Sequence, residues 1–240
     1  MLAAVGWGAL AASSLVLGAV LAFAHRWPKR AVGLVLAFGA GALISAVSFE
    51  LAGEGIKVGS LRSTAIGLGI GAFTYFAADG LIERRTSAGP GQDGAGSSAG
   101  PALALGAFLD GIPEQLVLGI GVATGEGVGV GLLVAIFVSN LPEAIGSASE
   151  MERGGVSRSR ILGLWGVVAA LCTLATVAGY AAADAASGEL TAAIDGFAAG
   201  ALLVMLIDSM IPEATKESGR VAGLVTTLGF AVATALSSIS

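Results

Sequence analysis

Eight long apolar runs constrain the fold of this chain more than any other feature. A helix that crosses the hydrocarbon core of a membrane needs about 20 such residues, and these runs are continuous, which argues against the alternating strands of a membrane barrel. The mean hydropathy is +0.87 and only 12% of the residues are charged. We therefore predict an all-α membrane protein, a single domain over residues 1–240, with eight transmembrane helices near 4–24, 32–56, 63–82, 102–123, 128–149, 160–183, 191–213 and 221–239.

The distribution of basic residues among the loops predicts the orientation of the chain across the membrane. Ten of the 12 lysines and arginines follow the odd-numbered spans, and only Lys57 and Arg62 follow an even-numbered one. Because cytoplasmic loops carry the excess of Lys and Arg, we expect a multi-pass protein of the cell membrane with both termini outside. The Gly/Ser/Pro-rich stretch 86–101 is then expected to be a flexible cytoplasmic loop.

The second and seventh spans share a sequence pattern. The run Ala40-Gly41-Ala42-Leu43 matches Ala199-Gly200-Ala201-Leu202, and the same offset pairs Glu54 with Glu213 and Lys57 with Lys216. These two spans cross the membrane in opposite directions, which is the mark of an inverted repeat. We expect helices 1–3 and 6–8 to be the related units, arranged around helices 4 and 5.

The fourth and fifth spans each carry a proline and an acid in the middle of an apolar run. Asp110 and Glu114 lie four residues apart, as do Ser139 and Glu143, so each pair shares one helix face. Pro113 and Pro142 each free a carbonyl one turn earlier, and Asn140 lies beside Glu143. An ionised carboxylate at this depth is costly and usually faces a partner, an ion or water. No basic residue shares these spans, so a bound cation is the simplest partner.

Four further acids are candidates for an ion pathway. Glu50 and Glu54 are in the second span, and Asp208 and Glu213 are in the seventh. We interpret Glu54 and Glu213 as an entrance and an exit residue, with the interfacial alternative open. Asp195 is a weaker candidate.

Other classes of function have little support. The net charge of −5 says little about nucleic-acid binding in a membrane protein, but no basic stripe indicates it, and we expect no nucleic-acid partner. The chain has one histidine, His25, and no His-Glu-x-x-His run, so neither zinc-protease nor Ser-His chemistry is available, and we predict no enzyme activity. No organic cofactor is indicated, and the expected partners are a metal ion and the lipid bilayer. A proton- or sodium-coupled carrier of another solute stays open.

Taken together, the eight spans, the long loop after the third and the paired Pro-Glu motifs resemble the ZIP metal transporters over essentially the whole chain. The fourth span of that family typically reads His-Asn-x-Pro-Glu-Gly, and the fifth is similar. The matching runs here are Asp110-Gly111-Ile112-Pro113-Glu114-Gln115, Ser139-Asn140-Leu141-Pro142-Glu143-Ala144 and, in the seventh span, Ile211-Pro212-Glu213-Ala214.

The resemblance implies two adjoining metal positions. One would be formed by Asp110, Glu114, Ser139 and Glu143, and the other by Glu114, Asn140 and Glu143. It also implies a pathway between the fourth and fifth spans, flanked by the second and seventh, and a homodimer.

The chain departs from the family pattern at the ligands. Asp110 and Ser139 replace the two histidines, Gly111 replaces the asparagine, and the apolar run of the sixth span has no glutamate. We therefore expect the second position to be weak or absent. Oxygen ligands in place of imidazole shift the preference toward manganese, iron(II) or magnesium relative to zinc, without excluding zinc.

Two hypotheses follow. The first is transport of a divalent metal ion into the cytoplasm through a carboxylate-lined site between helices 4 and 5. The second is a ZIP-like scaffold that has lost transport and serves a structural or regulatory role in the membrane.

Overall fold

The structure is a computed structural model that describes residues 1–87, 99–123, 130–186 and 188–238, with the side chains of 82–87, 99–110 and 130 outside that description. All regular structure within these ranges is helical. The segments are α1 (Leu2–Ala24), α2 (Lys29–Ala46), η1 (Val47–Gly53), α3 (Glu54–Val58), α4 (Leu61–Ser87), α5 (Ala99–Ala123), α6 (Val130–Arg153), α7 (Arg158–Asp184), α8 (Glu189–Met205), η2 (Leu206–Met210), α9 (Ile211–Ser218) and α10 (Val221–Ser237).

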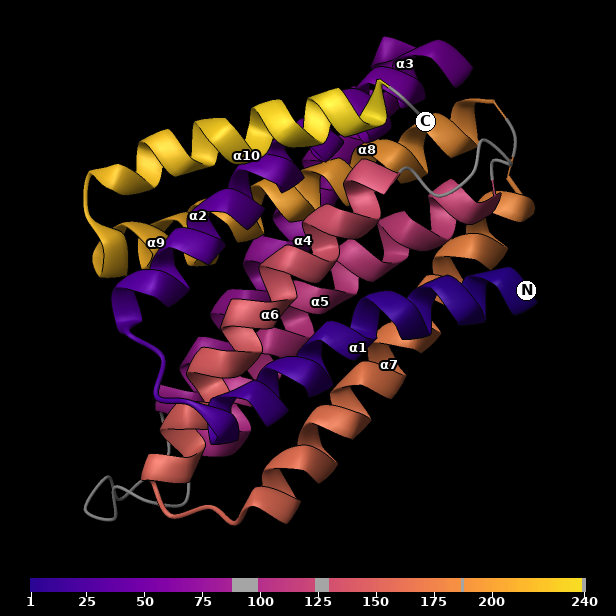
Figure 1. Ribbon diagram of the computed structural model, residues 1–240. Coiled ribbons are helices and arrows are strands. Elements are labelled where there is room, and N and C mark those ends of the chain that lie inside the picture. The colour runs from indigo at the N-terminus through magenta and orange to yellow at the C-terminus, as the bar shows by residue number, and fades with distance from the viewer. Residues whose placement is uncertain (88–98, 124–129, 187, 239–240) are drawn as a thin grey trace.

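These segments make up the eight predicted spans, because α2, η1 and α3 form one continuous rod and α8, η2 and α9 form another (Figure 1). Among the described residues, six helices are long and apolar enough to cross a membrane, and two shorter apolar stretches, Gly111–Ala123 and Val221–Ser237, complete the set. The all-α fold is therefore confirmed. The predicted loop 86–101 is helical up to Ser87 and again from Ala99, and its residues 88–98 lie outside the described ranges.

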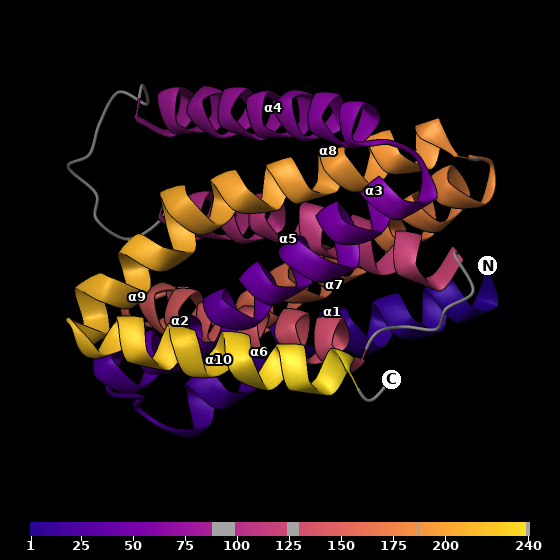
Figure 2. The same ribbon diagram turned by 90° about the horizontal axis from the view of Figure 1, so that it is seen from above.

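The helices pack as symmetric pairs. Helix α2 packs on α10 as α8 packs on α4, and α1 packs on α6 as α5 packs on α7. In the order of the spans, α1, α2 and α4 correspond to α7, α8 and α10, and α5 corresponds to α6. Exchanging each helix for its counterpart converts each pair into the other. In Figure 2, α4 and α10 accordingly lie on opposite sides of the molecule, outside α8 and α2. This is the arrangement that the inverted repeat predicts.

The two long rods share the same interruption. In each, the α-helix changes to a π-helix, η1 or η2, before returning to α-helix. Their first residues, Val47 and Leu206, stand at the same offset as the matching residues Ala40 and Ala199. A π-helical turn widens the helix and is frequent at functional sites. The repeat therefore extends to a local feature that apolar patterning does not specify.

Glycines bring the paired rods into backbone contact. A Cβ atom at Gly41 would collide with the carbonyl oxygen of Thr226 on α10, and one at Gly200 would collide with the carbonyl oxygen of Leu68 on α4. Helices in lipid associate through such close packing, since lipid tails are as apolar as the helix surfaces. These two repeat-related glycines thus allow the same close backbone contact in the two halves of the chain.

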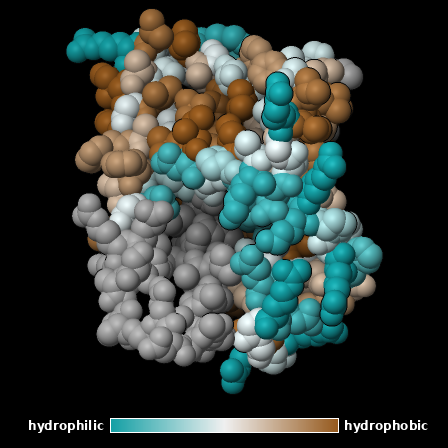
Figure 3. Space-filling view, turned by 90° about the vertical axis from the view of Figure 1, so that its left-hand side faces the viewer, coloured by the Kyte–Doolittle hydropathy of each residue, from teal (hydrophilic) through white to brown (hydrophobic). Residues whose placement is uncertain are grey.

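Figure 3 views the end of the bundle at which α1 ends and α7 begins. Hydrophilic side chains gather over part of this end, while hydrophobic side chains cover the region above them. Arg153, at the end of α6, and Arg158 and Arg160, at the start of α7, are exposed, and the guanidinium of Arg158 pairs with Glu152 at 2.7 Å. The distribution fits a bundle whose ends meet water and whose flanks meet lipid.

Gly41→Ala and Gly200→Ala are each expected to lower the free energy of unfolding by about 1–3 kcal/mol, because the added methyl group forces two helices apart. Unfolding in denaturing detergent, followed by circular dichroism, measures this. Gly69→Ala and Gly223→Ala are matched controls, since a Cβ at either meets nothing within 4 Å. Equal stability of all four variants would contradict the packing described here.

Candidate functional site

Glu114 is the centre of the candidate site. It lies on α5, one residue after the proline through which that helix continues, and its side chain is only 2% exposed. Oε1 accepts a hydrogen bond from the Ser139 hydroxyl at 2.9 Å, and Oε2 accepts one from Asn140 Nδ2 at 2.7 Å. A carboxylate buried in a membrane protein is thus held by two donors from the neighbouring helix α6.

Both donors are themselves fixed by α6. The Ser139 hydroxyl and Asn140 Nδ2 also contact the carbonyl oxygen of Ile136, at 3.0 and 2.9 Å. Because Asn140 Nδ2 has an acceptor on each side, the orientation of this amide is determined by its surroundings. On the far side of Ser139, a Cβ at Gly39 of α2 would lie 2.9 Å from the Ser139 Cα. The pair Ser139–Asn140 is therefore clamped between α5 and α2.

Glu143 is half-buried on the same helix as Ser139 and Asn140. Glu143 and Glu114 both lie close enough to the Cys172 thiol of α7 to act on it electrostatically. The thiol of α7 thus lies near an acid of α5 and an acid of α6. Asp110 belongs to α5, and its side chain lies outside the described residues. Among the side chains that are described, no group of three His, Cys, Asp or Glu residues gathers closely enough to enclose a metal ion.

Gly111 occupies the position of the family's asparagine. A Cβ atom there would lie 2.9 Å from the Cys172 sulfur, so an asparagine would have to displace this buried thiol. The glycine and the cysteine therefore fit one another, and this contact accounts for the missing asparagine in terms of packing.

Sequence reasoning missed a second polar contact behind Glu114. Gln115 and Thr176 are both fully buried, and the Thr176 hydroxyl donates a hydrogen bond to Gln115 Oε1 at 2.5 Å. Gln115 Nε2 has no partner among the described residues. The spacing of Gly111 and Gln115, four residues apart on one helix face, is the signal that identifies the α7-facing side of α5.

The four candidate pathway residues fall into different places. Glu50 is half-buried at the beginning of α6, where it accepts a hydrogen bond from Ser237 and lies near Gly131. Glu213 lies beside the other end of α6. Glu54 pairs with Lys57 at 2.9 Å. Asp208 lines an apolar groove between α8 and α4, together with Phe73 and Phe76. The structure thus places Glu50 and Glu213 beside the two ends of α6, whereas Glu54 contacts Lys57 and Asp208 lines the groove next to α4.

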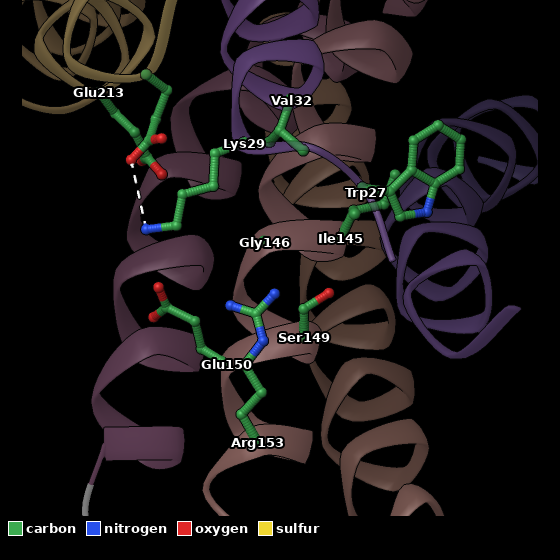
Figure 4. Close-up of a pocket in the computed structure, with 10 residues that line it drawn as sticks. Trp27, Lys29, Val32, Ile145, Gly146, Ser149, Glu150, Arg153 and Glu213 are labelled. Carbon is green, nitrogen blue, oxygen red and sulfur yellow. Dashed lines mark ion pairs between the residues drawn. The ribbon is translucent and has the colours of Figure 1, made fainter. Parts of the chain in front are cut away.

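Glu213 lines a small cleft, about 50 Å³ in volume, between α9, the start of α2 and the end of α6 (Figure 4). Lys29 reaches across this cleft to Glu217, with 3.8 Å between Nζ and Oε1. Glu150, Arg153 and Ser149 line its α6 side, and Trp27 and Val32 line the α2 side. Ile145, which follows Glu143 by two residues on α6, also lines this cleft, whereas Glu143 itself does not.

The membrane-crossing helices and their inverted repeat define a multi-pass membrane protein with a buried carboxylate between its two central spans. A family model described as ZIP Zinc transporter matches residues 83–237, more than half of the chain. The chain belongs to the ZIP family. It is 30% identical, over 211 residues, to the "Putative zinc transporter At3g08650" of Arabidopsis thaliana. That alignment covers 86% of this chain and 34% of the plant protein, so the chain spans about a third of that relative.

Asn140→Ala is expected to lower the free energy of unfolding by roughly 1–3 kcal/mol, because it leaves a buried carboxylate oxygen of Glu114 without its donor. Chemical unfolding of the purified protein in detergent measures the loss. Ser147→Ala, on the same helix, is the control. The double variant Glu114→Gln/Asn140→Ala is expected to lose less than the sum of the two single changes, and strict additivity would contradict the contact.

Proposed function

We propose that this protein carries a divalent metal ion of the zinc, iron and manganese class across the membrane, into the cytoplasm. The observation that carries the proposal is the buried Glu114, which accepts hydrogen bonds from Ser139 and Asn140 between two proline-bearing helices of a ZIP-family chain. Acidic and neutral oxygen groups from α5 and α6 supply the ligands that such ions accept. Asp110, one turn before Glu114 on α5, would add a third carboxylate.

The hydrogen bonds of Glu114 suggest how an ion enters the site. Ser139 and Asn140 now present donors to the carboxylate. A cation repels donors, so binding requires the Asn140 amide to rotate and offer its oxygen, and the Ser139 hydroxyl to turn its lone pairs toward the ion. The exchange keeps Glu114 partnered throughout, because the ion replaces two hydrogen bonds. This avoids an unpaired buried carboxylate, whose cost is high.

The position of Glu50 and Glu213 supports a route along α6. One acid lies at each end of this helix, and the Ser139–Glu143 segment lies between them. The cleft next to Glu213 would be the cytoplasmic mouth, because the basic residues Lys29 and Arg153 line it and positive charge marks the cytoplasmic side. Both termini then lie outside the cell.

Glu114→Ala and Glu143→Ala are each expected to abolish metal flux while leaving the protein folded, because each removes a carboxylate ligand. Uptake of Zn²⁺, Mn²⁺ or Fe²⁺ into proteoliposomes that contain a metal-sensitive dye measures this. Glu152→Gln is the matched control, an acid of the same helix whose partner is Arg158. Wild-type flux in both alanine variants would reject the site.

Metal binding is expected to weaken as the pH falls from about 7 to about 5, because ligating carboxylates must release their protons before an ion binds. Calorimetric titration of the purified protein at a series of pH values measures this dependence. Glu143→Gln removes one titrating ligand, and so it is expected to flatten the profile. An affinity that is independent of pH would count against carboxylate ligation.

The second candidate function is a ZIP-like scaffold without transport. One observation favours it: both oxygens of Glu114 are already satisfied by protein donors. The two functions differ in metal binding, and a protein that shows no calorimetric response to millimolar Zn²⁺, Mn²⁺, Fe²⁺ or Co²⁺ is the scaffold. A saturable response that Glu114→Ala removes supports transport.

A further inference from the structure

A cleft at one end of the bundle gathers basic side chains that take no part in the site of Glu114. It lies where α1 ends, α6 ends and α7 begins, and α1 packs on both of the other helices (Figure 1). Its volume is about 620 Å³, within the range of sites that bind small molecules. Its lining includes His25, Arg26, Arg153 and Arg158.

The charge of this cleft is positive. Three arginines line it, whereas Glu152 is the one acid among its described lining residues. Arg153 also lines the smaller cleft of Figure 4, so its guanidinium lies between the two. With His25 neutral, the lining keeps an excess of two positive charges. A cleft with this charge favours an anion as its occupant.

The arginines still have donors to offer. Arg158 Nε donates a hydrogen bond to Glu152 at 2.7 Å, and its guanidinium carbon lies 5.1 Å from the centre of the Phe23 ring. These two contacts hold the guanidinium against the wall of the cleft. Its Nη groups, and the whole guanidinium groups of Arg26 and Arg153, have no ion-pair or hydrogen-bond partner among the described residues. The cleft therefore has more donors than acceptors.

The cleft lies at the level where the apolar spans end. The apolar run of α1 ends at Ala24, and that of α7 begins at Ile161. Leu17 of α1 and Val167 of α7, within about three turns of the cleft, are exposed apolar side chains of the kind that meets lipid. The headgroup region of a bilayer begins where such runs end. A phospholipid therefore places its phosphate at the depth of this cleft.

We propose that the cleft binds the phosphate of an anionic phospholipid of the adjoining leaflet, which is the cytoplasmic leaflet in the orientation proposed above. Guanidinium groups bind phosphate through paired N–H donors. Basic pockets between transmembrane helices on the cytoplasmic side are typical sites for anionic headgroups. A dissolved phosphate ion offers the same chemistry, but the bilayer holds lipid phosphate at this depth at all times. The site is independent of the proposed transport function, since it uses none of the metal-site residues.

Native mass spectrometry of the full chain in a neutral detergent, with phosphatidylglycerol and phosphatidylcholine added in equal amounts, tests the proposal. Preferential retention of phosphatidylglycerol is expected, because its net negative charge complements the cleft. Arg26→Gln/Arg158→Gln is expected to weaken this binding at least about tenfold, since each change removes a favourable contact with the headgroup. Both arginines are exposed, so the variant is expected to fold.

Arg30→Gln/Arg160→Gln is the matched control. It removes the same charge from two exposed arginines that belong to the same end of the bundle but do not line the cleft. Wild-type binding of phosphatidylglycerol is expected in this variant. Equal losses in the two double variants would show a diffuse effect of surface charge and would overturn the proposal.

Glu152→Gln is expected to have the opposite effect. It removes the acid that lines the cleft, so phosphatidylglycerol is expected to bind severalfold more tightly, a gain that partial unfolding cannot produce. Unchanged or weaker binding in this variant would contradict the proposal. Inorganic phosphate at millimolar concentration is expected to leave the lipid bound. Its displacement by phosphate would show a site for a dissolved anion, and equal retention of phosphatidylcholine would show no preference for charge; either result overturns the assignment.

Discussion

Close approach of helix backbones is the constraint on which the rest of this structure depends. Lipid gives two apolar helices no hydrophobic reason to associate, so association requires tight van der Waals packing along the contact. Gly41, Gly200, Gly229 and Gly196 meet this requirement by placing a backbone where a side chain would otherwise stand. The paired rods that result, α2 with α10 and α8 with α4, fix the surroundings against which α5 and α6 lie.

The burial of Glu114 depends on this framework. Its donors belong to the next helix, and they are held in place because Gly39 lets α2 press on the backbone of Ser139. A substitution that weakens the packing of α2 on α6 would therefore disturb the hydrogen bonds of the Glu114 carboxylate, although α2 does not donate any of them. The fold and the site therefore depend on the same helix, because α6 packs against α2 and also supplies the donors to Glu114.

Much of the fold could be predicted from the sequence, because each span is a continuous apolar run and the repeat preserves residue offsets. The π-helical segments could not, since nothing in an apolar run specifies a wider turn. The spacing of the Pro-Glu motifs indicated which residues share a face within each helix, and the resemblance to the ZIP family implied that Glu114 lies beside Ser139 and Asn140. The contact of Gln115 with Thr176, and the position of Asp195 against α3 and α4, depend on how each helix is rotated. The rotation of a helix about its own axis cannot be predicted from the sequence when the helix is apolar on every side.

The matched π-helical segments and glycines show that one structural unit occurs twice in this chain, once in each direction across the membrane. Such a unit must be stable whichever way it is inserted, so its internal packing cannot depend on which side faces the cytoplasm. Orientation is then a property of the connecting segments, where the basic residues stand, and not of the helices themselves.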